Sequence, residues 1–348
     1  MKTVKEKMIL ENRDISFDIF RSLIITSAIV LHFNNRFTLG VFAYPFRFIN
    51  SHLFNVGNFF FFTAGYMGYL NYYKNNKRNI QYDSIKSIKK GFYILFVYCS
   101  FVTFMKVLTN SNIPNNFFDF FWNHRFYAKV LVTFSFVYIM SPVILKIFKV
   151  NKIVSIILFI IAYLVYVQNY SMENSSNNFL GIFFGIGYKS IYYPFVASLI
   201  VYCFGFYVSF CEHRYNVLFN KKIGFISMLT IILHSILIVS YPEYKEIIHF
   251  REIWLLITSC LIVAFIITLR WCLSYKKFFV FLNSKNLTLI GVKSLSFYVI
   301  SNLFLGFILV PENSGIIYNF IVLAMIFTLS YIFTKWHYYS DFKIGKIK

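Results

Sequence analysis

The chain contains long apolar stretches of about 18–23 residues each, separated by short hydrophilic connections. An α-helix needs about 20 apolar residues to cross a hydrocarbon core of about 30 Å, so stretches of this length predict membrane-spanning helices. The pattern predicts an all-α polytopic membrane protein, with residues 1–348 forming a single integral-membrane domain of about ten spans. We place these spans near 15–34, 52–72, 91–109, 126–145, 153–169, 190–211, 223–241, 252–272, 288–310 and 315–335.

The composition excludes a soluble globular domain. Hydrophobic residues make up 58% of the 348 and charged residues only 14%, whereas soluble domains average about 45–50% apolar and about 25% charged residues. The 34 Lys and Arg against 13 Asp and Glu give a net charge of +21. Most of these cations lie in connections between apolar stretches, where they set topology and meet anionic lipid. The expected partner is therefore the lipid bilayer and not a nucleic acid.

The distribution of the cations predicts an orientation. An even number of spans places both termini on the same side of the membrane. With the termini in the cytoplasm, roughly three cations lie on the cytoplasmic side for each one outside, which is the positive-inside bias of multi-pass proteins. The connection 73–90 is then cytoplasmic and the connection 170–189 lies outside.

Three outward connections, 33–51, 110–125 and 170–189, mix Asn and Ser with aromatic residues and a few charges. Aromatic rings can cover the apolar faces of sugars while amides bond their hydroxyls, but the same mixture is ordinary at a membrane interface. Composition alone leaves sugar binding and interfacial anchoring both open.

Neither the cysteines nor the known phosphate-binding motifs indicate a cofactor. The chain has no Walker loop, Gly-rich dinucleotide fingerprint, paired metal ligands or nucleophile elbow. The cysteines lie in or at the ends of apolar stretches without zinc or redox spacing, so we expect packing roles, no disulfide and no metal site. They are Cys99, Cys203, Cys211, Cys260 and Cys272.

The first span, ISFDIFRSLIITSAIVLHFNN, contains three ionisable residues. A charge at the centre of a span costs roughly 2.5–3.5 kcal/mol on insertion scales, so such residues require an explanation. Asp18 and Arg21 are three positions apart and can pair on one helical face. His32 follows Arg21 by eleven positions, close to three full turns, so these two share a face about 16 Å apart along the axis.

Two interpretations of these residues remain open on the first span alone. An imidazole can take a proton from a hydroxyl near neutral pH, and a membrane-embedded arginine can hold a phosphate or a carboxylate. The structural alternative makes Asp18 and Arg21 an anchoring pair and makes His32 an interfacial residue whose polar end reaches the headgroups.

In the first span, the segment DIFR ends at Arg21 and is followed by ten residues and then His32. This pattern resembles that of the membrane acyltransferase-3 family. The likeness continues in the second span, VGNFFFFTAGYMGYL, and in the Lys-rich IKSIKKGFYILF before the third. It covers most of the chain, and the Arg–ten residues–His spacing is its most specific element. Single matching residues in the fourth and ninth spans are Tyr138, Pro142, Ser294 and Tyr298.

This resemblance implies an O-acyltransferase of the bacterial inner membrane. Members pass an acyl group, often acetyl from cytoplasmic acetyl-CoA, to a hydroxyl of a surface polysaccharide such as an O-antigen or of its lipid-linked precursor. Arg21 becomes a donor-binding or structural residue and His32 the base or transient acyl carrier. Acyl-CoA is then a co-substrate and not a bound cofactor. Supporting roles fall on Asp18, Ser294, Tyr298, Ser301 and Asn302.

The sequence departs from the family pattern at Ala64, where Ser is usual, and at Ala128 and Ser301, where His is common. If the second His acts in relatives, this protein either does without it or uses Ser301 or Asn302 in its place. His234, inside the seventh span, is a further candidate, with a packing role as its alternative.

A group of lysines at the start of the third span offers a donor site. Lys86, Lys89 and Lys90 face the cytoplasm in this topology and could hold the phosphates of CoA, although a positive-inside cluster needs no such function. The rival functions are a polysaccharide polymerase, a lipid-linked oligosaccharide flippase and a secondary transporter, the last expected to show inverted repeats and broken helices. The acyl group, the acceptor hydroxyl and the oligomeric state stay undetermined by the sequence.

Overall fold

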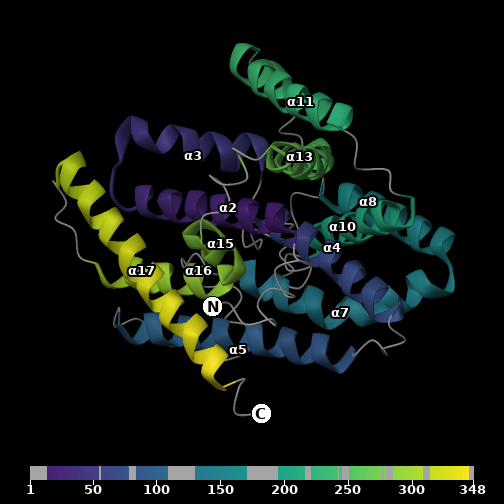
Figure 1. Ribbon diagram of the computed structural model, residues 1–348, viewed down its shortest axis with the longest axis horizontal. Helices are drawn as coiled ribbons and strands as arrows, with labels where there is room; N and C mark the ends of the chain where they lie inside the picture. Colours follow the sequence, from purple (N-terminus) through teal and green to yellow (C-terminus); the bar gives the residue numbers. More distant parts are fainter. Residues whose placement is uncertain are drawn as a thin grey trace. The chain divides into compact units, whose positions relative to one another are not determined.

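The computed structural model describes residues 14–54, 56–77, 84–108, 130–170, 195–215, 221–241, 243–244, 251–275, 278, 285–308 and 314–344. Every secondary-structure element in these ranges is helical (Figure 1), as predicted. Seven of the described helices are long and apolar enough to cross a membrane. They are α2 (Ile15–Asn34), α5 (Ser84–Leu108), α7 (Val130–Val150), α10 (Phe195–Tyr215), α11 (Lys221–Ser240), α13 (Arg251–Leu273) and α17 (Ile316–Ile344).

Each of the ten predicted ranges overlaps at least one helix, although the number of spans stays a prediction. The other described helices are α4 (Val56–Lys77), α8 (Lys152–Tyr170), α15 (Lys285–Val292) and α16 (Ser294–Phe307). The connection 33–51 also contains short helical segments, which the sequence did not predict. These are η1 (Gly40–Ala43), α3 (Tyr44–Phe48) and the start of η2 (Ile49–Leu53).

The ninth predicted span is two helices and not one. The range 288–310 was expected to form a continuous helix, but α15 ends at Val292 and α16 begins at Ser294. Lys293 between them has φ −108° and ψ 34°, outside helical values. Gly291 and the β-branched Val292 lower the helix propensity just before this point. Backbone hydrogen bonds from Lys293 N to Leu289 O and from Phe297 N to Lys293 O join this residue to both helices, so the chain bends locally at Lys293.

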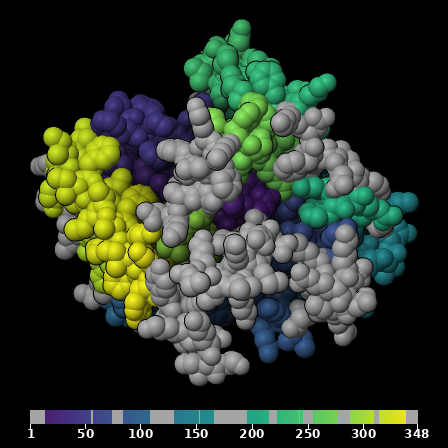
Figure 2. All heavy atoms as spheres, viewed as in Figure 1, coloured from purple at the N-terminus to yellow at the C-terminus, as the bar shows by residue number. Residues whose placement is uncertain are grey.

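The chain divides into two compact units. Unit 1 comprises Met1–Asn50, Phe219–His234 and Val263–Lys348, and unit 2 comprises Ser51–Leu218 and Ser235–Ile262. In unit 1, α2 packs against α3, α15 and α16, and α16 packs against α17. Helix α17, yellow in Figure 2, carries exposed apolar side chains such as Ile317, Ile321 and Trp336, as expected for a helix that faces lipid.

Helix α2 is the best-buried candidate span and has a defined start. Asp14 caps it by accepting hydrogen bonds from Ser16 N at 3.0 Å and Ser16 Oγ at 2.5 Å. Because the first N–H groups of a helix lack internal partners, such a cap stabilises the first turn. Asp14 also accepts from Arg270 of α13, with distances of 2.8 Å to Nε and 2.5 Å to Nη2. The sequence did not predict this ion pair.

Unit 2 is held together by close contacts at small residues. A Cβ atom on Gly65 of α4 would lie 1.9 Å from the carbonyl oxygen of Tyr202 in α10, so only glycine allows this approach. Helix α5 runs antiparallel to α7, since Ser87 bonds Ser141 at 2.5 Å while Gly91 lies against Ile139. Neighbouring helices of opposite direction are the arrangement expected of consecutive spans.

Candidate active site

His32 lies in the last turn of α2 and is hydrogen-bonded to a residue of α16. Its Nδ1 atom is 2.9 Å from Oδ1 of Asn302. The ring of Tyr298, one turn earlier in α16, lies edge-on to the imidazole with 5.9 Å between ring centroids. His32 is partly exposed, whereas Asn302 and Tyr298 are buried. The structure thus brings three of the predicted site residues together in unit 1.

The hydrogen bonds of Asn302 assign the protons on the imidazole. The Nδ2 atom of Asn302 donates to the carbonyl oxygen of Tyr298 at 2.8 Å, which directs Oδ1 toward His32. A carbonyl oxygen can only accept, so Nδ1 of neutral His32 must carry its proton. The basic lone pair is then on Nε2. This is the tautomer assignment that a second-layer hydrogen bond commonly sets for a catalytic histidine.

Ser301 and Ser294 do not take part in this hydrogen bond. Ser301 is fully buried and its Oγ donates to the carbonyl oxygen of Phe297 in its own helix at 2.7 Å. Ser294 begins α16, about 12 Å along the axis from Asn302. Of the two residues named to replace the second His of the family, Asn302 is therefore the one bonded to His32.

Asp18 and Arg21 form the ion pair expected from their spacing. Nη1 of Arg21 lies 3.6 Å from Oδ1 of Asp18, and the side chains are 18% and 3% exposed. Gly291 of α15 packs directly on this turn, since a Cβ at that position would lie 1.9 Å from the carbonyl oxygen of Asp18. The pair is therefore placed beside the bend between α15 and α16, not at an exposed interface.

Arg36 also connects α2 to α16, and the sequence did not predict it as a site residue. Its Nη1 donates to the carbonyl oxygen of Leu305, in the last turn of α16. The last carbonyls of a helix have no internal partner, so a cation there is favourable. The sequence did contain a sign of this role. Arg36 follows His32 by four positions at the end of α2, a spacing that places two side chains on the same side of a helical turn.

The lysines of the predicted donor site lie in unit 2. Lys86 and Lys89 are exposed on the first turns of α5. Lys90 donates to the hydroxyl of Tyr138 at 2.9 Å and lies 4.3 Å from the centre of its ring. Tyr138, matched to the family from the sequence, thus orients one of the three lysines.

The remaining predicted residues do not enlarge the site. Ala64 and His234 are both buried, in α4 and α11 respectively. Ala128 and the connection 110–125 lie outside the described residues, as does 170–189 apart from its first residue. All five cysteines are free thiols, and within the described ranges no three His, Cys, Asp or Glu side chains gather as metal ligands would.

Comparison of the chain with protein-family models and with curated proteins gave no match. Assignment to the acyltransferase-3 family rests on the resemblance of the residues and stays a proposal.

Proposed function

We propose that the protein is a membrane O-acyltransferase of the bacterial inner membrane. It transfers an acyl group, in the first instance acetyl, from cytoplasmic acyl-CoA to a hydroxyl of a surface polysaccharide or its lipid-linked precursor. The observation that carries this proposal is the hydrogen bond between His32 and Asn302, which places the basic lone pair of the histidine on Nε2. The Arg–ten residues–His pattern of the first span supports it.

The reaction assigns a specific step to His32. The acceptor hydroxyl oxygen forms a bond to the carbonyl carbon of the thioester, and the carbon–sulfur bond breaks. Nε2 takes the hydroxyl proton and passes it to the departing thiolate of CoA. Asn302 holds the imidazole and stabilises its cation by accepting from Nδ1. In a two-step variant the same Nε2 carries the acyl group transiently.

The charged residues have accessory roles in this proposal. Arg21 binds an anionic part of the donor or fixes α2, with Asp18 orienting its guanidinium group. Lys86 and Lys89, both exposed, would meet the phosphates of CoA at the cytoplasmic face. Tyr298 packs on the histidine ring and limits its orientations.

Glycan mass spectrometry of cells with and without the gene tests the proposal. We expect the glycan to lose the mass of one acyl unit when the gene is deleted, and to regain it with the wild-type chain. His32→Gln should fail to restore it, because glutamine keeps polarity but cannot take a proton; a general base contributes about 10²–10⁴-fold. His337→Gln, at an exposed histidine of α17, is the matched control. Full acylation with His32→Gln would remove this histidine from the mechanism.

One observation favours a second candidate, a lipid-linked oligosaccharide flippase. The bend between α15 and α16 lies beside the ion pair of the buried Asp18 and the partly exposed Arg21, and interrupted helices border the substrate sites of many transporters. In that case deletion of the gene would leave glycan acylation unchanged and would reduce the amount of glycan on the outer surface. A polymerase would instead change the chain length.

A further inference from the structure

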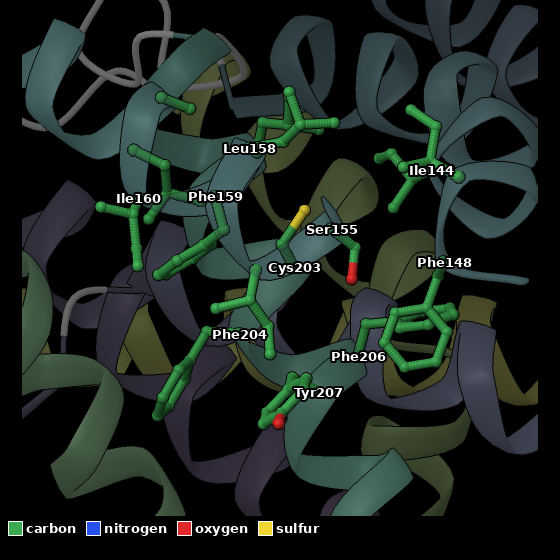
Figure 3. Close-up of a pocket in the computed structure, with 15 residues that line it drawn as sticks. Ile144, Phe148, Ser155, Leu158, Phe159, Ile160, Cys203, Phe204, Phe206 and Tyr207 are labelled. Atoms are coloured by element: carbon green, nitrogen blue, oxygen red, sulfur yellow. The ribbon is translucent and has the colours of Figure 1, made fainter. Parts of the chain in front are cut away.

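Unit 2 contains an apolar pocket with a volume of about 480 Å³ between α7, α8 and α10. Figure 3 shows Ile144 and Phe148 of α7 on one side of this pocket and Phe159 and Ile160 of α8 on the other, with α10 contributing Cys203 and its neighbours. The volume lies within the range of about 300–1,000 Å³ of small-molecule sites. It is therefore large enough for a ligand and not only for a few water molecules.

The lining indicates a hydrocarbon ligand. Its only polar side chains are Ser155, Cys203 and Tyr207 among fifteen lining residues. A sugar or a nucleotide would leave many polar groups without partners in such surroundings, at a considerable cost for each. Next to the pocket, α8 exposes Ile157, Ile161 and Leu164, which are 49%, 49% and 58% exposed. In a chain that crosses a membrane, this exposed face meets lipid tails.

The aromatic ring of Phe148 connects the pocket to a second cluster of side chains. Phe148 lines the pocket and also packs on Tyr69 and Phe210, with ring centroids 6.0 Å and 5.2 Å apart. Tyr69 in turn contacts Tyr72 and Tyr73 at 6.0 Å and 6.1 Å. These residues lie near the C-terminal ends of α4, α7 and α10, so the three helices end together at this side of the pocket.

Two cations border this end, and we call Lys149 and Arg214 the cationic rim. The ammonium group of Lys149 lies 4.8 Å from the centre of the Tyr72 ring, and the guanidinium group of Arg214 lies 5.8 Å from that of Phe210. Both are exposed. The neighbouring acidic group, Glu212, accepts a hydrogen bond from the Tyr66 hydroxyl at 2.5 Å, and the rim keeps a net positive charge.

We propose that this pocket binds one acyl chain of an anionic phospholipid from the surrounding bilayer, with its phosphate held at the cationic rim. The apolar pocket lies next to the cationic rim, just as the acyl chain of a phospholipid lies next to its charged headgroup. Each one to two lysines or arginines near a membrane surface raise the affinity for anionic lipid about tenfold. A bilayer lipid reaches the pocket along the exposed face of α8 without leaving the hydrocarbon.

Native mass spectrometry of the full chain, purified in mild detergent, tests this proposal. We expect one retained phospholipid, and after exchange against equal amounts of phosphatidylglycerol and phosphatidylcholine we expect the former to predominate. Ala162→Trp fills the pocket and should abolish retention. Ile161→Trp, one residue earlier on the exposed face, is the matched control and should keep the lipid.

The charge at the rim has its own variant and control. Lys149→Gln combined with Arg214→Gln should reduce the preference for phosphatidylglycerol about tenfold or more. Lys335→Gln removes a lysine that also lies over a tyrosine ring, at 6.0 Å from that of Tyr331, and should leave the preference unchanged. An unchanged preference in the double variant would overturn the assignment of the rim.

A fluorescence measurement covers the case in which Ala162→Trp does not fold. In a chain whose four native tryptophans are replaced by phenylalanine, Tyr207→Trp places the reporter in the pocket wall, where phosphatidylglycerol with brominated chains should quench it more strongly than brominated phosphatidylcholine. Equal quenching, no retained lipid, or retention of a polyprenyl phosphate or an acyl-CoA in its place would each overturn the proposal. Phospholipid binding does not depend on the acyltransferase reaction, so loss of acylation in His32→Gln and loss of lipid in Ala162→Trp are distinguishable.

Discussion

Asn302 accepts a hydrogen bond from Nδ1 of His32 at 2.9 Å while its own amide nitrogen donates to the carbonyl oxygen of Tyr298. Both ends of one amide group are used, so the imidazole is held in one tautomer by a partner on another helix. This geometry separates the role of Asn302 from that of the histidine.

Substitution of Asn302 should affect acylation according to its ability to accept a hydrogen bond. Asn302→Leu has nearly the same size but no acceptor, and we expect a loss of about 10-fold or more in acylation at equal protein abundance. Asn302→Asp keeps an acceptor for His32 and should retain much more activity. Equal activity in the two variants, measured by glycan mass spectrometry, would mean that the amide does not position the histidine.

The ion pair in the first span predicts which of its two residues matters more for acylation. Asp18→Asn should weaken acylation less than Arg21→Ala does, because asparagine can still accept a hydrogen bond from the guanidinium group. Acylation is compared at matched membrane abundance, since loss of one partner of a largely buried pair also destabilises a protein. An equal or greater loss in Asp18→Asn would assign the carboxylate a role of its own.

Close packing of α15 on α2 predicts a stability effect at Gly291. Gly291→Ala brings a Cβ atom to within 1.9 Å of the carbonyl oxygen of Asp18, so the helices must separate, at a cost of about 1–3 kcal/mol. Gly315→Ala is the matched control, because nothing lies within 4 Å of its Cβ position. Thermal unfolding in detergent should show a lower Tm only for Gly291→Ala. An equal Tm for both variants would contradict the close contact.

The cation distribution predicts how the chain is oriented in the membrane. In a chain whose native cysteines are replaced by serine, Ser176→Cys should react with an impermeant maleimide in intact cells. Ser84→Cys, beside the lysines of α5, should react only after the membrane is permeabilised. Labelling of position 84 from outside would overturn the predicted orientation and with it a cytoplasmic site for acyl-CoA.

Local patterns in the sequence predicted the features that depend on residues close together in the chain, such as helix positions and pairs within one helix. Helix α2 has the bounds 15–34 that its apolar stretch predicted, and Asp18 pairs with Arg21 because residues three apart share a helical face. The helical class of the other described segments follows for the same reason: a long apolar segment must satisfy its backbone hydrogen bonds internally in a membrane.

Only the tertiary structure decided which distant residues meet. His32 and Asn302 are 270 positions apart, and Asp14 and Arg270 are 256 apart, so their hydrogen bonds depend on how α2 packs against later helices. The bend at Lys293 was missed because an apolar stretch of sufficient length does not distinguish one helix from two that are pinned separately to α2. Hydropathy and spacing determine where helices form, whereas the shapes of their packed faces determine which polar groups come within bonding distance.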